Sequence, residues 1–125
     1  MSKYIFPALI WLIIVTWLSV IPNLQLPPME FIASDKLGHT AAYFLLCFLV
    51  LWGLFRHSPD SMPNKRQALF VMLFCAGYGI LMEFVQYFFI PGRYCEFYDM
   101  VANALGAVLG WLAFRLIFRK KLIKT

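Results

Sequence analysis

Four long apolar segments limit what this chain can fold into. They occupy residues 4–21, 37–55, 68–90 and 100–118 of the 125, and each is 18 to 23 residues long. An α-helix needs about 20 apolar residues to span the hydrocarbon core of a bilayer. The connections are short, so they leave no room for a soluble domain. We therefore predict an all-α fold, a polytopic membrane protein built as a four-transmembrane-helix bundle, with a single domain over residues 1–125.

Composition excludes several other classes of protein. Hydrophobic residues make up 62% of the chain and charged residues 14%, against about 45–50% and about 25% in soluble proteins. Such a chain lacks the polar surface of a soluble enzyme and the polarity of a disordered tail. The net charge of +5 does not indicate a nucleic-acid partner, because the basic residues form no stripe with base-stacking aromatics. Membrane lipids are the expected surroundings.

The ends of the apolar segments carry helix signals. Asp35 and Asp99 stand where the N-caps of the second and fourth helices are expected. We interpret the first segment as an uncleaved helix, because its apolar core is too long for a signal peptide and no Ala-x-Ala-like site follows it.

The distribution of basic residues predicts the orientation in the membrane. If the N-terminus is cytoplasmic, nine of the eleven Lys and Arg residues lie on the cytoplasmic side, and only Lys36 and Arg93 lie outside. This positive-inside bias predicts that both termini are cytoplasmic. The basic tail at 119–124 is expected to lie against anionic headgroups. The nine are Lys3, Arg56, Lys65, Arg66, Arg115, Arg119, Lys120, Lys121 and Lys124.

The remaining polar residues gather in the outward-facing half. Of the six acidic residues, only Asp60 maps to the inner side. Ionisable groups within a bilayer are costly and normally face a bundle interior or a wet cavity. The pattern therefore predicts a site open to the outer leaflet. Its candidate residues are Glu30, Asp35, Lys36, His39, Glu83, Gln86, Arg93, Glu96, Asp99 and Asn103.

Helical spacing indicates which of these side chains can meet. Asp35, His39 and Tyr43 are four residues apart and stack on one face of the second helix. Glu83 and Gln86 share a face of the third helix, and at 1.5 Å per residue Glu83 lies about 12 Å below the Pro91 that ends it. Asp99 and Asn103 share a face of the fourth helix. A buried Glu83 must be paired, hydrogen-bonded or neutral, and its candidate partners are His39, Arg93 and Gln86.

Each candidate also has a purely structural interpretation. Asp35 and Asp99 can serve as plain N-caps, and His39 can be a hydrogen-bonding residue near the interface. Gln86 and Asn103 can link helices by hydrogen bonds.

Small and sulfur-containing residues point mainly to packing. Ala102, Gly106 and Gly110 form a small-xxx-small stripe, which lets another helix approach closely, either within the chain or in a homodimer. Cys47 and Cys75 fall mid-membrane and are expected to be inert packing residues.

Three motifs in order resemble the VanZ-like family of membrane proteins. Asp35-Lys36-x-x-His39 with Tyr43 is similar to its D-K-x-x-H…Y opening, and Glu83-x-x-Gln86 to its E-x-x-Q. Arg93, Asp99, Asn103 and Gly106 are similar to its R-x5-D-x3-N-x2-G; the family often has Ser or Thr just before the Asp, where this chain has Cys95-Glu96-Phe97-Tyr98. The resemblance runs from about Asp35 to Gly110. It implies a small multi-pass protein of the bacterial cytoplasmic membrane, in a family whose founding member is associated with resistance to teicoplanin-type glycopeptide antibiotics.

Three classes of function fit these residues. The first is an enzyme acting on an anionic cell-envelope precursor or its D-Ala-type peptide terminus, with Glu83 or His39 as general base, Asp99 as orienting group or acid, and Arg93 as an anion clamp. The second is a binding protein that shields such a substrate without turnover. The third is a small proton-coupled transporter with Glu83 as relay, which is disfavoured because nothing polar continues the path inward.

The same groups define the expected ligand contacts. Substrate binding is assigned to Arg93, Asp35, Lys36, Gln86, Asn103 and Tyr43. A metal site built from His39, Glu83 and Asp99 is the minor alternative, because it has one His and the chain has no His-x3-His pair. No cofactor is therefore expected.

Overall fold

The computed structural model describes residues 3–20, 32–57, 63–90 and 97–123, with the backbone alone at 32–36 and 119–123. A short 3-10 helix, η1 (Lys3–Ile5), leads into α1 (Phe6–Val20), and then come α2 (Ile32–His57), α3 (Lys65–Phe89) and α4 (Phe97–Ile123). The described part of the chain contains no strand. All four α-helical segments are long and apolar enough to cross a membrane. The prediction of an all-α, four-transmembrane-helix fold is confirmed.

Three helices extend beyond the apolar segments that predicted them. α2 begins at Ile32 instead of residue 37, α3 at Lys65 instead of 68, and α4 runs from Phe97 to Ile123 instead of 100–118. The prediction followed hydropathy, whereas a helix can continue into the interfacial region where polar side chains are solvated. Asp35 therefore lies inside α2, and Asp99 lies in the first turn of α4. The expectation that these two residues are N-caps is wrong.

A capping box fixes the start of α3. The Asn64 side chain accepts a hydrogen bond from the Gln67 backbone N–H at 2.8 Å, and the Gln67 side chain accepts one from the Asn64 backbone N–H at 3.0 Å. Each bond satisfies a backbone donor that a helix start leaves open. The Asn-x-x-Gln spacing was the signal in the sequence that the prediction of this boundary missed.

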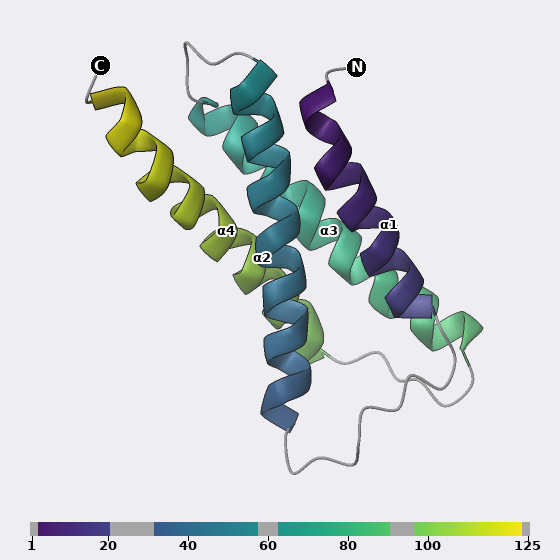
Figure 1. Cartoon of the computed structure of the whole chain (residues 1–125). Helices are drawn as coiled ribbons and strands as arrows, with labels where there is room; N and C mark the ends of the chain where they lie inside the picture. Colours follow the sequence, from purple (N-terminus) through teal and green to yellow (C-terminus); the bar gives the residue numbers. More distant parts are fainter. Residues whose placement is uncertain (1–2, 21–31, 58–62, 91–96, 124–125) are drawn as a thin grey trace.

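Two helices, α2 and α4, cross at close range through small residues (Figure 1). A Cβ atom on Gly106 would collide with the backbone of Thr40, and one on Gly110 would collide with the carbonyl of Phe44. Both glycines are buried. The small-residue stripe is thus occupied by α2 of the same chain. A homodimer through Gly106 and Gly110 would have to displace that helix.

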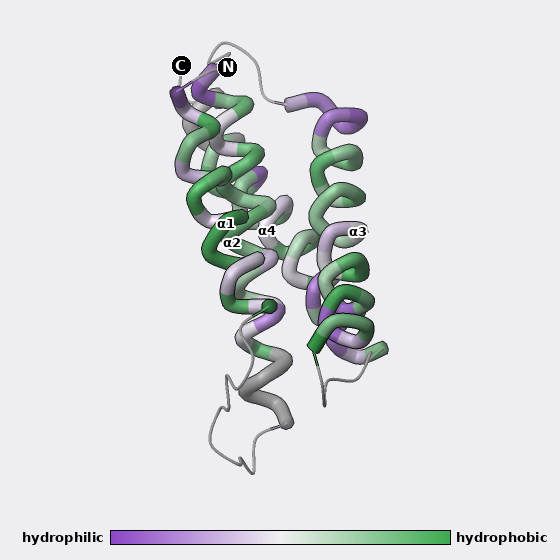
Figure 2. The backbone as a smooth tube through the Cα atoms, turned by 90° about the vertical axis from the view of Figure 1, so that its right-hand side faces the viewer, coloured by the Kyte–Doolittle hydropathy of each residue, from purple (hydrophilic) through white to green (hydrophobic). Residues whose placement is uncertain are grey.

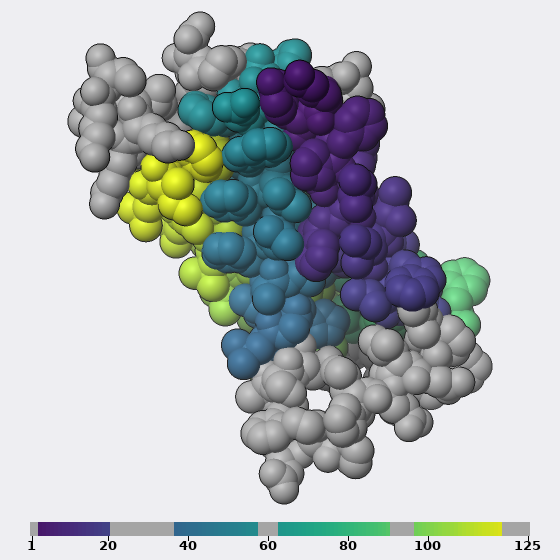
Figure 3. All heavy atoms as spheres, in the orientation of Figure 1, coloured from purple at the N-terminus to yellow at the C-terminus, as the bar shows by residue number. Residues whose placement is uncertain are grey.

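The first helix is held against the bundle by polar contacts. Trp11 donates its indole N–H to the Ala42 carbonyl of α2 at 2.8 Å, and the Thr16 hydroxyl is hydrogen-bonded to the hydroxyl of Tyr78 on α3. In the space-filling view of Figure 3, α1 lies alongside α2. These contacts hold α1 against α2 and α3, and a hydrogen bond from Gln86 to Ser19 links the ends of α3 and α1.

Apolar packing dominates one half of the bundle. Phe48, Phe55, Phe114 and Phe118 form a cluster of rings whose centroids lie 4.8 to 6.2 Å apart in the contacting pairs. Many large apolar side chains also face outward along the helices, as expected for a lipid-facing surface. Figure 2 shows the hydrophobic colour along most of the tube and hydrophilic segments toward its two ends.

Candidate functional site

The buried polar side chains gather at one end of the bundle. The start of α2, the end of α3 and the start of α4 form this end, which we call the polar end. The sequence predicted this concentration, and the prediction holds for the described residues. The buried polar residues among them are Glu83 and Asn103, each 1% exposed, Gln86 at 6% and Asp99 at 7%.

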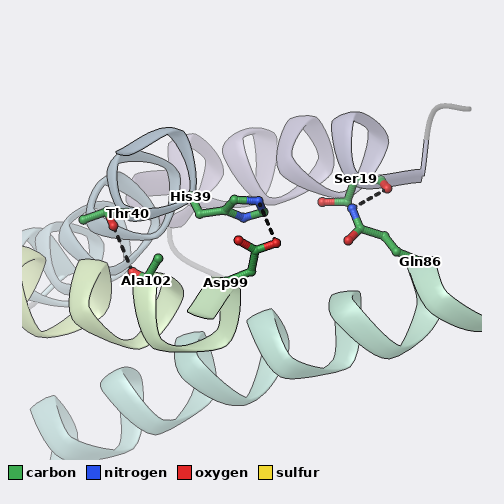
Figure 4. Close-up of polar contacts among 6 residues, drawn as sticks. All are labelled: Ser19, His39, Thr40, Gln86, Asp99 and Ala102. Carbon is green, nitrogen blue, oxygen red and sulfur yellow. Dashed lines mark hydrogen bonds and ion pairs between the residues drawn. The ribbon is translucent and has the colours of Figure 1, made fainter. Parts of the chain in front are cut away.

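Three ionisable side chains from three different helices meet at the polar end. His39 comes from α2, Glu83 from α3 and Asp99 from α4, and each offers a ligand atom within 4.8 Å of the other two. The His39 Nε2 and Asp99 Oδ2 atoms are 3.8 Å apart, and Figure 4 shows the ring and the carboxylate facing each other. We call these three residues the acid–histidine cluster. They are the three residues to which the sequence assigned acid–base roles.

A second layer lies one helical turn deeper. Tyr43 follows His39 by four residues, Asn103 follows Asp99 by four, and Gly79 precedes Glu83 by four. Gly79 leaves room for Asn103, because an added Cβ would lie 2.7 Å from the Asn103 Nδ2 atom. Spacing predicted the places of Tyr43 and Asn103. The role of Gly79 was missed, although its distance from Glu83 along the sequence was a usable signal.

One atom of this second layer is buried without a partner. The Asn103 Oδ1 atom has no hydrogen bond to any described residue. A buried polar atom without a partner is costly and calls for an explanation.

Hydrogen bonds between helices hold the walls of the cluster. The Gln86 side chain donates to the Ser19 carbonyl of α1 at 2.8 Å, and the Thr40 hydroxyl donates to the Ala102 carbonyl of α4 at 3.2 Å (Figure 4). The contact of Gln86 favours its interpretation as a link between helices. Thr40 was missed, because a hydroxyl in an apolar helix carries no pattern that distinguishes it.

Electrostatics make the cluster costly unless it is neutralised. Two ionised carboxylates this close and this buried repel each other unless neighbouring groups balance their charge. The N-terminal end of α4 helps Asp99, which lies in its first turn, because that end carries a partial positive charge.

Several predicted binding residues fall outside the described side chains. Arg93, the proposed anion clamp, lies outside the described residues altogether. The α2 backbone continues through Asp35 and Lys36, so Asp35 is one turn from His39 along the same helix. Their contacts with a ligand stay predictions.

The opposite end of the bundle has a different character. A cavity of about 440 Å³ opens there between α2, α3 and α4, and two of its lining residues, Lys65 and Arg115, are basic. Arg56 lies over the rings of Tyr4 and Trp52 at this same end. None of the predicted site residues lines the cavity, so it belongs to the basic end of the bundle and not to the acid–histidine cluster.

Comparison of the sequence with known proteins identifies the family of this chain. The VanZ/LLP1 family model matches residues 4–119. The chain is 31% identical over 117 residues to "Uncharacterized protein C11E3.10" of Schizosaccharomyces pombe, covering 93% of this chain and 65% of that relative, so it spans just under two thirds of the relative's length. No solved structure matches the chain. The match includes every residue of the acid–histidine cluster, the whole of α1, α2 and α3, and α4 up to residue 119, and the chain belongs to the VanZ/LLP1 family.

Proposed function

We propose that the polar end faces the outer leaflet and acts on an anionic, lipid-linked substrate of the cell envelope by acid–base chemistry. The observation that carries the proposal is the meeting of His39, Glu83 and Asp99, from three helices, in a buried position.

The free-energy cost of the cluster favours function over packing. Ionisable side chains within a membrane segment are costly and normally face a bundle interior or a water-filled cavity. Apolar residues of similar volume would fill the same space at no such cost. Ionisable residues within membrane segments mark functional sites by default for this reason.

The geometry suggests a role for each member of the cluster. Glu83 is the most buried of the three and is the candidate base, while His39, with its side chain 24% exposed, can exchange protons with the surroundings. Asp99 faces His39 at 3.8 Å, longer than a hydrogen bond but within the looser range of catalytic pairs without substrate. Asp99 is therefore the residue that orients His39.

The substrate is proposed to be recognised by its phosphate and not by a peptide terminus. One relative of this chain is a fungal protein, so a substrate shared with that relative would not be a peptide found in bacterial walls alone. A phosphate on a membrane lipid is the chemistry common to both kinds of organism. Arg93 follows the apolar segment of α3, and Lys36 precedes the apolar segment of α2. Both side chains would therefore bind that phosphate at the membrane surface. Shielding such a lipid would also fit the family's association with glycopeptide resistance.

Lipid analysis of purified protein tests the proposal. We expect mass spectrometry to find an anionic lipid that copurifies with the wild type and is depleted in Glu83→Gln and His39→Gln. The chain has two histidines, and the other, His57, is exposed at the basic end. His57→Gln is therefore the matched control and should retain the lipid. Equal lipid content in His39→Gln and His57→Gln would refute the proposal.

A further inference from the structure

We infer that His39, Glu83 and Asp99 form a binding site for a divalent transition-metal ion of the Zn²⁺ or Mn²⁺ class. The ion can bind in the absence of substrate. A catalytic role for the ion, by contrast, rests on the proposed function. The sequence made this the minor alternative because the set has one His and the chain has no His-x3-His pair. The fold brings them together from α2, α3 and α4.

Distances within the cluster fit an ion. Zn²⁺ binds histidine nitrogen and carboxylate oxygen at about 2.0–2.2 Å, so two of its ligands in tetrahedral geometry are about 3.4 Å apart. The His39 Nε2 and Asp99 Oδ2 atoms are 3.8 Å apart, and a ligand atom of Glu83 lies within 4.8 Å of both. Side-chain movements of a few tenths of an ångström would bring the His39 and Asp99 atoms to the separation of two ligands on one ion. The same pair is too far apart for a direct hydrogen bond.

The charges of the three groups suit a divalent ion. Two ionised carboxylates and a neutral imidazole together carry a charge of −2, and an M²⁺ ion carries the opposite charge.

The ligand types select among divalent ions. One imidazole nitrogen and two carboxylate oxygens suit Zn²⁺, Mn²⁺ or Fe²⁺, whereas Ca²⁺ and Mg²⁺ prefer oxygen ligands. Three protein ligands also leave a coordination position open, as in catalytic metal sites. An anionic oxygen of a substrate could fill that position.

An independent observation comes from the layer beneath the cluster. The carbonyl oxygen of Asn103 is the one buried side-chain polar atom among the described residues that lacks a hydrogen-bond partner. Asn103 is 1% exposed and lies one turn from Asp99 on the same face of α4. A water bound to the ion would give that oxygen a partner. His39 is the exposed edge of the cluster and supplies an entry path for the ion.

Metal titration of the purified full chain tests the inference. Detergent-solubilised protein is stripped with a chelator and titrated with Co²⁺, whose visible absorption reports nitrogen and oxygen coordination, and with Zn²⁺, quantified by elemental analysis. We expect one ion per chain in the wild type and in His57→Gln. His39→Gln and Asp99→Asn should lose at least the roughly 10–100-fold in affinity that changes around metal ligands cause.

Thermal unfolding keeps the test decisive if a variant folds poorly. Zn²⁺ should raise the unfolding temperature of the wild type and of His57→Gln, and a chelator should reverse the shift. Absence of both the Co²⁺ absorption and the thermal shift in folded wild type would overturn the inference, as would equal affinity in His39→Gln and His57→Gln. Lipid copurification measured on the chelator-stripped wild type separates the two proposals. Protein that retains its lipid but binds no metal would support the proposed function and refute the metal site. Protein that binds metal but carries no lipid would support the metal site and refute the proposed function.

Discussion

Replacement of Gly106 by alanine should loosen the crossing of α2 and α4. The added methyl group would collide with the backbone of Thr40 and with the amide nitrogen of Phe44, and backbone atoms cannot move aside as a flexible side chain can. The helices must separate, which also strains the hydrogen bond from the Thr40 hydroxyl to the Ala102 carbonyl. A matched control exists in Gly77 of α3, where an added Cβ meets nothing within 4 Å.

The magnitude follows from the two contributions. Over-packing of a tight interface costs about 1–3 kcal/mol, and a hydrogen bond between membrane helices contributes about 0.6 kcal/mol. Both substitutions gain the same helix propensity, up to about 1 kcal/mol in each variant, so this gain cancels in the comparison. Gly106→Ala should therefore be less stable than Gly77→Ala by about 1.6–3.6 kcal/mol.

The comparison is measured as the free energy of unfolding in mixed micelles, followed by tryptophan fluorescence at several protein concentrations. A difference below about 0.5 kcal/mol between the two variants would refute the close α2–α4 crossing. A destabilisation that grows with dilution in the wild type would instead place the glycine stripe between two chains.

Three further predictions, the first with a control variant, test the packing of the bundle. Phe114→Ala, in the aromatic cluster, should cost about 3–5 kcal/mol of unfolding free energy, whereas Phe88→Ala, which is 70% exposed in the wild type, should cost little; equal costs would contradict the position of the core. Gln86→Leu removes the hydrogen bond to Ser19 and should speed amide hydrogen exchange at the end of α1, and unchanged exchange would show that this bond does not hold the helix. Asn64→Ala removes the capping box of α3 and should lower the free energy of unfolding by about 1 kcal/mol. A free energy of unfolding equal to that of the wild type would argue against the cap.

Hydropathy and spacing predicted much of this structure because a few strong constraints govern membrane helices. A span must be long and apolar, so all four helices could be located from the sequence. Glu83 and Asp99 could be named as site residues because their charge is costly in such surroundings. Helix ends were less accurate, since the limits of hydropathy at residues 37 and 100 do not mark where the hydrogen-bonded backbone of α2 and α4 begins.

The contacts between helices were beyond the reach of the sequence. Spacing within one helix relates Asp99 to Asn103, but it does not show that Gly79 of another helix makes room for Asn103. It also does not show that His39 meets Asp99, a contact between residues 60 positions apart. Such contacts depend on how the helices cross, and the crossing depends on steric fit at positions such as Gly106 that hydropathy does not register.

The central claim is that the acid–histidine cluster is retained for a ligand and not for folding. It is tested most directly in a triple variant, His39→Leu with Glu83→Met and Asp99→Leu, which replaces all three groups by apolar side chains of similar volume. We expect its free energy of unfolding to equal that of the ligand-free wild type or to exceed it by about 1–4 kcal/mol, while the copurifying anionic lipid is lost. A less stable variant that still carries the lipid would contradict the claim.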